Sequence, residues 1–349
     1  MLKDIPLAPL TTLKIGGPAR FFVRAESEQQ VCDAFEYSNK EGLDLFVLGG
    51  GSNILVADEG FDGLVLQIAE CGMRNAESRP ASKAGDDRII VTAKAGEDWD
   101  GFVSYCVGLD LAGVECLSGI PGFVGGTPVQ NVGAYGQEVS ETIVSVRCLD
   151  RQSGNVVDLT NAYCGFEYRT SIFNTSMRDR YIVLAVTYSL VANAPPQIAY
   201  KDLKEFFLGR EPTLGETREA VLRIRAAKSM VIDNDDPNSR SAGSFFKNPI
   251  VGLDVLAKII GNTEIDRVPH FEVGADLVKI PAAWLIENAG FQKGFVMGNA
   301  GISTRHSLAI VNRGNATAKD IIALKDRIVA EVAAKFGIEL RPEPIFVGF

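Results

Sequence analysis

Apolar side chains recur at helical spacing along three segments of the chain, and two further segments are predicted to be helical, one from its charged pattern and one from its opening proline. Ser27 precedes the first segment and Gly42 follows it, as an N-cap and a terminating glycine do. Thr317 and Gly337 flank the last segment in the same way, which predicts a long amphipathic helix there. The five predicted helices lie between Ser27 and Gly42, around Trp99 to Cys106, and over Glu216–Lys228, Pro281–Asn288 and Thr317–Phe336.

Short apolar runs between these segments predict β-strands. The polar stretch Cys71–Asp87 contains a proline and is predicted to be an exposed loop. The Pro-Pro pair within Ala192–Gln197 interrupts the pattern, so a domain boundary is predicted near residue 200. The predicted strands are Leu45–Leu48, Gly63–Ile68, Arg88–Ala93, Ile143–Leu149 and Tyr181–Leu190.

Composition limits the class of protein. A chain of 349 residues is long enough for two domains, each with its own core. The net charge of −9 disfavours nucleic acid as the main partner, and no apolar run has the length of a membrane span. The N-terminus lacks a signal-peptide core, and the six cysteines are scattered without a Cys-x-x-Cys pair, which is typical of a cytoplasmic protein with reduced thiols. The two histidines, His270 and His306, are interpreted as surface or loop residues, so no metal centre is expected.

The stretch Ser118–Gly136 holds six glycines and two prolines in nineteen residues, with almost no charge. Helices and strands do not tolerate so much glycine, and a solvated linker would be more polar. Because the stretch also carries apolar side chains, we interpret it as a buried, ordered loop whose bare amides contact a ligand. A tight set of turns joining two elements is the alternative.

A second glycine cluster, Gly49–Asn53, follows the predicted strand Leu45–Leu48. Glycines at the end of a strand, followed by Ser and Asn, suit a backbone nest for a pyrophosphate. The spacing is not that of a Rossmann fingerprint, because Ile54 stands at its sixth position, and the chain has no Walker A triplet. The two clusters together indicate a large phosphate-bearing cofactor that is held by loops.

Three residues offer chemistry that does not need histidine. Arg169 follows Tyr168 and can hold a carboxylate and stabilise charge on it, with a surface salt bridge as the alternative. Ser244, within Ser241–Pro249, is acidic enough to protonate a carbanion or enolate, although a tight turn fits that sequence as well. Glu343 stands between two prolines that hold the backbone extended, and an exposed glutamate on a rigid tail is the simpler interpretation of that segment alone.

These segments follow one another in a specific order: Gly49–Asn53, the Ile-Pro-Gly…Pro-Val-Gln-Asn-Val-Gly-Ala-Tyr-Gly loop, Tyr168–Phe173, Gly243–Pro249 and Glu343. In this ordered set the chain resembles the UDP-N-acetylenolpyruvoylglucosamine reductases, the MurB-type flavoenzymes of peptidoglycan precursor synthesis. The resemblance runs from about Thr11 to the C-terminus. The Tyr-x-Asp-Leu segment at Tyr200 is similar to the type I branch, in which a tyrosine-bearing loop closes over the substrate.

The resemblance implies an α+β fold, with a two-part FAD-binding module of the vanillyl-alcohol-oxidase (PCMH) type and a smaller α/β substrate-binding domain. Residues 1–205, completed by the tail 336–349, would bind FAD, and residues 206–335 would bind substrate. NADPH would reduce FAD, the flavin N5 would deliver hydride to UDP-N-acetylglucosamine enolpyruvate, and a proton would complete UDP-N-acetylmuramate. The expected protein is a cytoplasmic monomer that serves cell-wall biogenesis, cell shape and cell division, acts on small molecules, and does not bind nucleic acid or membrane.

The resemblance also implies roles for single residues. Ser244 matches the proton donor to the enolate carbon, while Arg169 and Glu343 match the pair that stabilises the enolate. The matched FAD-facing positions are Gly49, Gly50, Gly51, Ser52, Asn53, Ser118, Ile120, Pro121, Gly122, Gly125, Gly126, Thr127, Asn131, Gly133 and Val183. The matched substrate-facing positions are Tyr135, Tyr168, Tyr200, Lys228, Phe245, Lys247, Asn248 and Asn288.

Some positions depart from the pattern of the family. Pro344 stands where many relatives carry a β-branched residue, Arg341 precedes the proline before Glu343, and Asn288 is shorter than the glutamine of some relatives. Two other classes of protein share part of the pattern. Another flavin oxidase would share the glycine clusters but has no reason to keep Gly-Ser-Phe-Phe-Lys-Asn-Pro, and a non-catalytic nucleotide-binding protein could lose Arg169, Ser244 or Glu343.

Overall fold

The computed structural model describes residues 1–69, 77–80, 87–262 and 268–349. Contacts between residues divide the chain into two compact units. Unit 1 consists of Met1–Ile5, Ala19–Gly51 and Asp62–Val231, and unit 2 consists of Pro6–Pro18, Ser52–Phe61 and Ile232–Phe349. Both units contain helices and strands, in agreement with the predicted α+β class. The predicted FAD-binding and substrate-binding domains describe function and stay a prediction.

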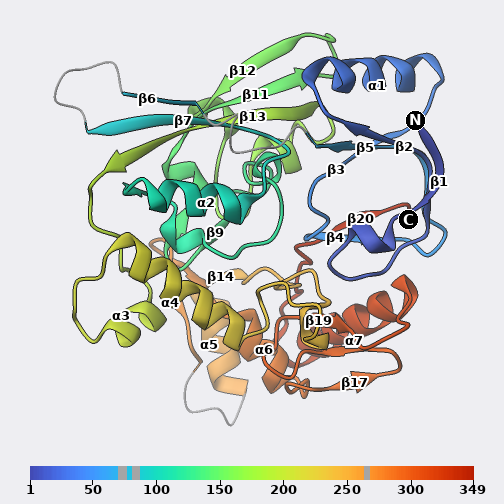
Figure 1. Cartoon of the computed structure of the whole chain (residues 1–349). Coiled ribbons are helices and arrows are strands. Elements are labelled where there is room, and N and C mark those ends of the chain that lie inside the picture. The colour runs from blue at the N-terminus through green and yellow to red at the C-terminus, as the bar shows by residue number, and fades with distance from the viewer. Residues whose placement is uncertain (70–76, 81–86, 263–267) are drawn as a thin grey trace. The chain divides into compact units, whose positions relative to one another are not determined.

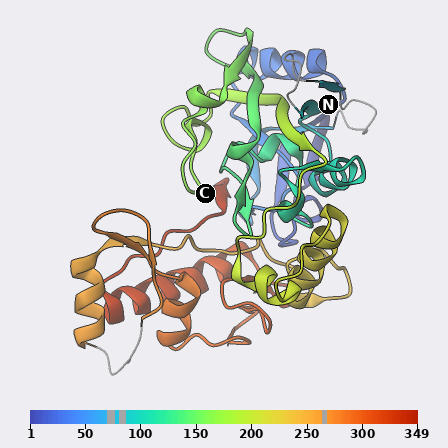
Figure 2. The ribbon, with the colours of Figure 1, turned by 90° about the vertical axis from the view of Figure 1, so that its left-hand side faces the viewer.

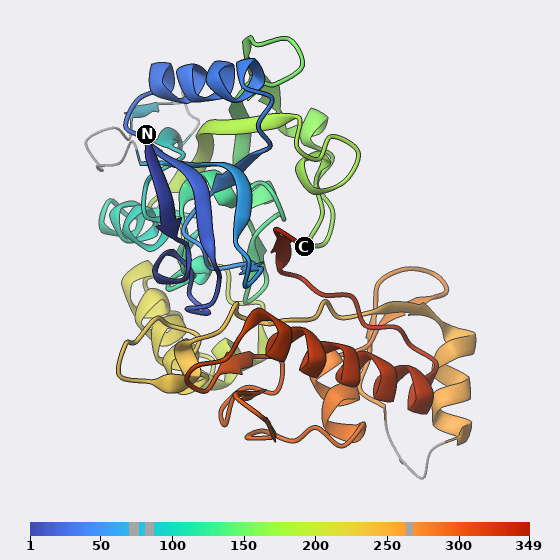
Figure 3. The ribbon, with the colours of Figure 1, turned by 90° about the vertical axis from the view of Figure 1, so that its right-hand side faces the viewer.

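The two larger sheets of unit 1 share one hydrophobic core. A four-stranded sheet has the order β1-β2-β5-β3, and its first three strands are the blue arrows of Figure 3. The larger sheet has the order β12-β11-β13-β7-β6, with β8 paired to β13, and its long strands lie side by side in Figure 1. Phe35 of α1, Leu64 of β5 and Val186 of β13 belong to the same buried cluster.

The elements of unit 1 have the following bounds. The strands are β1 (Leu2–Pro6), β2 (Pro18–Ala25), β3 (Leu45–Leu48), β5 (Phe61–Ile68), β6 (Glu77–Pro80), β7 (Arg88–Lys94), β8 (Leu111–Ala112), β9 (Gly133–Ala134), β10 (Gln137–Glu138), β11 (Ile143–Asp150), β12 (Val156–Thr160) and β13 (Tyr181–Ala192). The helices are α1 (Glu28–Lys40), α2 (Trp99–Gly108), α3 (Lys201–Phe207) and α4 (Leu214–Ala227). Short 3-10 turns lie at Glu115–Leu117, Val124–Gly126, Val139–Glu141, Asn161–Cys164 and Ile172–Asn174.

Unit 2 is built around the long helix α7. Figure 2 shows α6 beside α7, where the rings of Trp284 and Phe336 are 5.5 Å apart. Its helices are α5 (Leu253–Asn262), α6 (Ala282–Asn288) and α7 (Ala318–Phe336), with 3-10 turns at Ala8–Leu10 and Pro237–Ser239. Its strands are β4 (Ile54–Val56), β14 (Ile250–Gly252), β15 (Phe271–Glu272), β16 (Leu277–Lys279), β17 (Val296–Met297), β18 (Ala300–Ile302), β19 (Ile310–Asn312) and β20 (Ile345–Val347).

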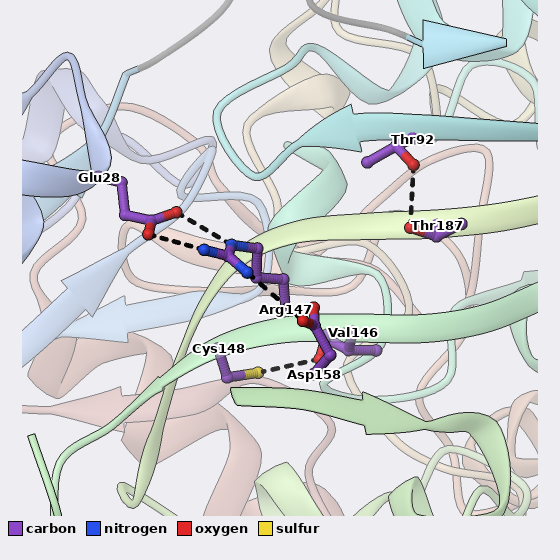
Figure 4. A network of polar contacts seen from close by, with 7 residues as sticks. All are labelled: Glu28, Thr92, Val146, Arg147, Cys148, Asp158 and Thr187. Carbon is purple, nitrogen blue, oxygen red and sulfur yellow. Dashed lines mark hydrogen bonds and ion pairs between the residues drawn. The ribbon is translucent and has the colours of Figure 1, made fainter. Parts of the chain in front are cut away.

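Polar side chains tie α1 to the larger sheet of unit 1. Arg147 on β11 donates from Nε and Nη2 to the two carboxylate oxygens of Glu28, at 3.1 and 3.0 Å. The same guanidinium donates to Asp158 on β12 at 3.4 Å (Figure 4). Thr92 and Thr187 share a hydrogen bond of 3.0 Å between the adjacent strands β7 and β13. The Glu28–Arg147 ion pair therefore joins the first helix of the unit to a strand 119 residues further along the chain.

The predicted helix ends are confirmed where a cap was recognised. Ser27 accepts a hydrogen bond from the backbone N–H of Gln30, as an N-cap does. Thr317 and Asp320 form a capping box at the start of α7, and Gly337 ends that helix with a φ of 68°. The five predicted strands are also present, as β3, β5, β7, β11 and β13.

The prediction of one exposed loop over Cys71–Asp87 is wrong at Glu77–Pro80. These four residues form β6 and pair antiparallel with β7, from Glu77 opposite Thr92 to Pro80 opposite Ile89. The edge of β7 offers backbone groups that a polar segment can satisfy, and a proline is tolerated at the edge of a sheet. Of the rest of the predicted loop, residues 71–76 and 81–86 lie outside the described residues.

The cysteines of the described residues are free, and four of the five are buried. Burial raises the pKa of the Cys106 thiol to about 12, and it also raises the pKa values of Cys116, Cys148 and Cys164. A buried thiol with a raised pKa is a poor nucleophile at neutral pH, so these residues act as small core side chains. In the described part of the chain, no helix combines the length and the apolar character that crossing a bilayer requires.

Candidate active site

The start of the parallel pair β4 and β20 brings two predicted site residues of unit 2 together. Ile345 pairs with Ile54, so Asn53 and Glu343 precede the paired strands on the same side. The Asn53 side chain donates from Nδ2 to the carbonyl oxygen of Glu343 at 3.3 Å. The backbone N–H of Ile345 donates to the carbonyl oxygen of Asn53 at 3.0 Å. The C-terminal glutamate is therefore fixed to the end of the first glycine cluster.

Ser244 lies one residue before a segment that pairs with the chain around Glu343. The backbone N–H of Glu343 donates to the carbonyl oxygen of Phe245 at 2.9 Å, and that of Lys247 donates to Arg341 at 3.0 Å. On its other side, Phe245 donates to the carbonyl oxygen of Leu308 at 2.8 Å. The structure therefore brings two of the three predicted catalytic residues, Ser244 and Glu343, onto adjacent backbone segments of unit 2.

The hydroxyl of Ser244 also has a side-chain partner. Its Oγ is 3.1 Å from Nε2 of His306, and both residues are half-buried. His306 stands in the turn that joins β18 to β19. The sequence analysis interpreted this histidine as a surface or loop residue, and the structure puts it in a loop with its ring against Ser244.

The other predicted substrate residues of unit 2 have structural contacts of their own. The Asn248 side chain accepts a hydrogen bond from the backbone N–H of Ala282 at 2.8 Å and so caps α6. Asn288 ends the same helix, where its side chain donates to Trp284 and its carbonyl oxygen accepts from Lys335. The ring of Phe245 is fully buried in the core of unit 2. The predicted contacts of these residues with substrate stay predictions.

In unit 1 the two glycine-rich segments touch each other. A Cβ at Gly50 would be 2.6 Å from the Cα of Gly122, which is closer than carbon atoms can approach. The second segment is fastened to the connection between β7 and α2 and to the first residue of α2. Trp99 donates to Gly122, Val124 donates to Glu97, and Gly125 donates to Ala95, at 2.9 to 3.0 Å. These contacts show that residues 118–127 are an ordered part of the loop predicted over residues 118–136. Ser118, Val124 and Thr127 are buried, whereas Gly126 is exposed, so the segment is only partly buried.

The glycine-rich segments have properties that fit a phosphate-bearing cofactor such as FAD. A Cβ built at Gly49 or Gly126 would meet no heavy atom within 4 Å among the described residues, so these backbone stretches face open space. Beside Gly119 lies Arg225, whose side chain is 7% exposed. Its Nε is buried and has no hydrogen-bond partner in the described part of the chain. The N–H of Gly119 itself donates to the Asp100 carboxylate, so the unused donor at this point is Nε of Arg225. A buried cation with an unused donor suits an anionic group.

Several predicted FAD-facing side chains are turned into the protein. Ser118 donates to the carbonyl oxygen of Glu115 at 2.7 Å, and Thr127 donates to Val124 at 2.8 Å. The amide of Asn131 donates to a carboxylate oxygen of Glu138 at 2.8 Å and is almost fully buried. Val183 is also buried, in β13. These side chains shape the loop, which leaves the backbone as the part that can contact a cofactor.

Arg169 is held in a strained backbone conformation. Its φ is 54°, and two nearby predicted site residues, Asn131 and Tyr135, have φ values of 46° and 50°. Left-handed conformations of non-glycine residues cost about 1 kcal/mol each and concentrate at functional sites. The Arg169 guanidinium donates to the carbonyl oxygens of Asn131 and Gly133 and lies 5.4 Å from the ring centre of Tyr168. The arginine is therefore aimed by the same loop that carries the glycines.

A third group of predicted residues meets in unit 1 around the end of α4. The rings of Tyr135 and Tyr200 are 5.4 Å apart in an edge-to-face arrangement. Lys228 donates to Asp202 at 2.7 Å. Burial is the largest single effect and lowers the pKa of Lys228, but the hydrogen bond to Asp202 and the charge interactions with Tyr135, Asp202 and Tyr200 together leave the pKa raised. Burial raises the pKa of Tyr135, against the charges of Arg225 and Lys228.

Sequence reasoning missed three polar residues that organise these regions. His306 contacts Ser244, and Arg225 lies beside Gly119. Glu115 is fully buried and accepts hydrogen bonds from Gly113, Gln137 and the backbone of Gln197, at 2.7 to 3.2 Å. No local spacing singles out any of the three, because each has a partner that lies 62 residues or more away along the chain. The predicted catalytic residues divide between the units, with Arg169 in unit 1 and Ser244 and Glu343 in unit 2.

Comparison with known proteins matches each half of the chain to a family model. Residues 19–160 match a family model described as an FAD binding domain. Residues 235–347 match the C-terminal domain of UDP-N-acetylenolpyruvoylglucosamine reductase. The matches to the two models support the predicted fold class, with an FAD-binding module in the N-terminal half.

Relatives of the same name align with almost the whole chain. The UDP-N-acetylenolpyruvoylglucosamine reductase of Thermobifida fusca is 44% identical over 99% of this chain and 98% of its own length. That of Saccharopolyspora erythraea is 45% identical over 98% of this chain and 94% of its own. The crystal structure of the UDP-N-acetylenolpyruvylglucosamine reductase from Thermus caldophilus superimposes with a TM-score of 0.65, at 26% identity and 99% coverage of both chains.

Proposed function

Because this chain belongs to the UDP-N-acetylenolpyruvoylglucosamine reductase family, we propose that it reduces UDP-N-acetylglucosamine enolpyruvate to UDP-N-acetylmuramate with electrons from NADPH. The family assignment makes it an FAD-binding oxidoreductase of peptidoglycan synthesis. The electron donor, the site residues, a monomeric state and a cytoplasmic location are parts of the proposal.

The glycine-rich segments 49–53 and 118–127 would hold FAD. Open backbone at Gly49 and Gly126 suits close approach of a flat ring or a diphosphate, and the buried guanidinium of Arg225 supplies positive charge beside Gly119. When bound, FAD supplies a carrier that accepts a hydride from NADPH and passes it to the substrate. The protein contributes the binding, the orientation and the electrostatics.

The chain's own residues would stabilise the charge that hydride addition leaves on the substrate. Addition to the terminal carbon of the enolpyruvyl group leaves negative charge on the adjoining carbon and its carboxylate. Arg169, aimed by two backbone carbonyls, would face that charge, and the Glu343 carboxyl would donate or share a hydrogen bond with it. Ser244 would then give its hydroxyl proton to the carbon, because an enolate carbon is far more basic than water.

The tyrosines and the lysine at the end of α4 would contact the sugar nucleotide. Lys228 is a cation whose raised pKa keeps it charged at neutral pH, which suits a diphosphate. Tyr200 is 45% exposed and packs edge-on against Tyr135, so its ring can move without opening a core. Tyr168, Phe245, Lys247, Asn248 and Asn288 complete the proposed substrate contacts.

One observation carries the chemical part of the proposal. The backbone hydrogen bond from Glu343 to Phe245 joins the residue after Ser244 to the C-terminal glutamate, although about 100 residues of chain separate them. A surface tail needs no such pairing, and a tight turn around Ser244 does not explain it. The pairing therefore supports an acid and a proton donor that work on one substrate atom.

An anaerobic experiment on the whole protein tests the proposal. The purified protein should carry a flavin spectrum that NADPH bleaches. Addition of UDP-N-acetylglucosamine enolpyruvate should then restore the oxidised spectrum with a stoichiometric yield of UDP-N-acetylmuramate, whereas UDP-N-acetylglucosamine should not. A flavin that NADPH bleaches but that this enolpyruvyl sugar nucleotide leaves reduced would overturn the proposed function. Stopped-flow measurements with NADPH and NADH determine the preferred donor.

A further inference from the structure

The partner of Ser244 lies in a turn that is fixed on both sides of the contact. Ser303 donates to the carbonyl oxygen of Ala309 at 2.9 Å, which closes the connection between β18 and β19. Within it, the N–H of Ala309 donates to the carbonyl oxygen of His306 at 3.1 Å. The hydroxyl of Ser307 donates to the Glu287 carboxylate on α6. His306 is therefore presented by a braced turn, and its ring position is built into unit 2.

The serine side of the contact is equally fixed. Phe245, the next residue, donates to the carbonyl oxygen of Leu308, so the backbone after Ser244 is joined to the histidine's own turn. The ring of Phe245 is fully buried in the core of unit 2. The separation of 3.1 Å between Oγ and Nε2 is thus held by backbone contacts in both segments, the one that carries Ser244 and the one that carries His306.

The direction of this hydrogen bond decides what the serine can do. If Oγ–H donates to Nε2, the serine proton is directed at the histidine, which is the arrangement of an activated nucleophile. If Nε2–H donates to Oγ, the serine proton must point away from the ring, towards another acceptor. The second arrangement is the one that a proton donor to carbon requires.

We propose that His306 is a positioning residue that donates from Nε2–H to the Ser244 hydroxyl. This inference rests on the proposed function and names a residue that Ser244 depends on. The donation directs the serine proton at the substrate, and it stabilises the oxygen once that proton has left. A hydrogen bond to a charged acceptor is stronger than one to a neutral acceptor, so its effect is largest while the proton moves.

The step balances without a further reactant. The Oγ–H bond of Ser244 breaks as a C–H bond forms at the enolate carbon, and the electron pair of the broken bond stays on Oγ. The negative charge then rests on Oγ, where it accepts the hydrogen bond from Nε2–H of His306. A proton from water restores the hydroxyl after the lactyl ether product leaves, which the half-buried position of both side chains permits.

The test compares the two half-reactions of the whole enzyme under anaerobic conditions. His306→Ala removes the donor, and we expect flavin reduction by NADPH at the wild-type rate but reoxidation by the enolpyruvyl sugar nucleotide slowed about 10- to 100-fold. His306→Gln keeps an N–H donor near the same place and should recover most of the reoxidation rate. His270→Gln is the matched control, because it changes the second histidine of unit 2, whose Nδ1 contacts the Val268 carbonyl, and should change neither rate.

Each result of this test either supports the role of His306 or overturns it. Reoxidation at the wild-type rate in His306→Ala overturns the inference, and so does equal slowing in His306→Ala and His306→Gln, because then the donor is not what matters. If His306→Ala loses its flavin, His306→Met fills the volume without a donor and takes its place under the same expectations. If the wild-type enzyme itself is not reoxidised by this substrate, the proposed function fails, and that result differs from any result expected of a variant alone.

Discussion

Position 50 requires glycine because its backbone lies against the second glycine-rich segment, at Gly122. A Cβ there would be 2.6 Å from Gly122 Cα and 3.1 Å from its carbonyl carbon, and backbone atoms cannot move aside as a flexible side chain can. We expect Gly50→Ala to lower the free energy of unfolding of the FAD-free protein by about 1–3 kcal/mol, measured by urea unfolding. Gly49→Ala is the control, since a Cβ there has no heavy atom within 4 Å among the described residues. Equal stability of the two variants would contradict the contact.

Loss of the Ser244 hydroxyl should slow reoxidation of the flavin by substrate and leave its reduction by NADPH nearly unchanged. Removing its hydroxyl with Ser244→Ala leaves the glycine-rich segments unchanged, so NADPH should bleach the flavin at nearly the normal rate. Reoxidation by the enolpyruvyl sugar nucleotide should slow by about 10²- to 10⁴-fold, the usual effect of losing a positioned proton donor. Stopped-flow absorbance of the flavin measures both rates. Equal slowing of the two half-reactions would indicate a structural role for the serine.

The sequence alone is informative about residues whose neighbours are close along the chain. Ser27 and Thr317 were predicted as helix caps because the backbone N–H groups that donate to their side chains lie only three residues away. His306 and Arg225 could not be assigned in this way, because Ser244 and Gly119 approach them only after folding. Ser244 and Glu343 were singled out from their segments and from the resemblance, and the structure adds that their segments pair.

A partly buried ion pair joins the end of β11 to the start of β13 in the larger sheet. Asp150 at the end of β11 accepts hydrogen bonds from Arg180 Nε and Nη2 at 3.0 and 2.9 Å, just before β13 begins. These hydrogen bonds, opposed by burial and aided by the N–H of Gln152, lower the pKa of Asp150 to about 2. A carboxyl with a lowered pKa in the folded state stabilises the fold above its unfolded pKa of about 4.

Asp150→Asn should therefore destabilise the protein in a pH-dependent way. At pH 7 and pH 5 we expect a loss of about 1–2 kcal/mol relative to wild type, after allowance for screening by solvent. The difference should shrink below about pH 4, where the unfolded carboxyl takes up its proton, and vanish as the pH approaches the folded value of about 2. Urea unfolding at several pH values measures it. Asp158→Asn, at a side chain that is 62% exposed, is the control, and a pH-independent loss in Asp150→Asn would contradict the ion-pair explanation.

The elements that could be predicted from the sequence are those that are long enough to show an apolar period. α1, α7 and the strands β7, β11 and β13 of the larger sheet have clear apolar patterns and were predicted within a few residues. The edge strand β6 was taken for a loop because its four residues carry charge and a proline and show no apolar pattern. It forms a strand because β7 offers backbone hydrogen-bonding partners along its edge. The short strands β18 and β19 hold the turn of His306, and two strands of three residues each are too short to show a period.

Unit 2 is assembled from three stretches of the chain, which local patterns cannot predict. β4 pairs parallel with β20, and Asn53 lies 290 residues before Glu343. Asp58 accepts from the backbone N–H groups of Ala318 and Lys319 at the start of α7, at 2.7 and 3.2 Å. The N-terminal stretches therefore complete both the last strand and the last helix. A boundary read from a Pro-Pro pair near residue 200 could not reveal this exchange, because it depends on pairing across almost the whole sequence.

Two buried leucines nine residues apart should consequently affect different parts of the chain. Leu55 on β4 belongs to the core of unit 2, and Leu64 on β5 belongs to the core of unit 1; both are 0% exposed. Leu55→Ala and Leu64→Ala should each cost about 2–5 kcal/mol, because each leaves a cavity in a packed core. Hydrogen exchange followed by mass spectrometry should show faster exchange in α6 and α7 for Leu55→Ala, and in α1 and β5 for Leu64→Ala. If Leu55→Ala loosened the strands of unit 1 and spared α7, residues 52–61 would belong with their sequence neighbours, and the interleaved assembly of unit 2 would be wrong.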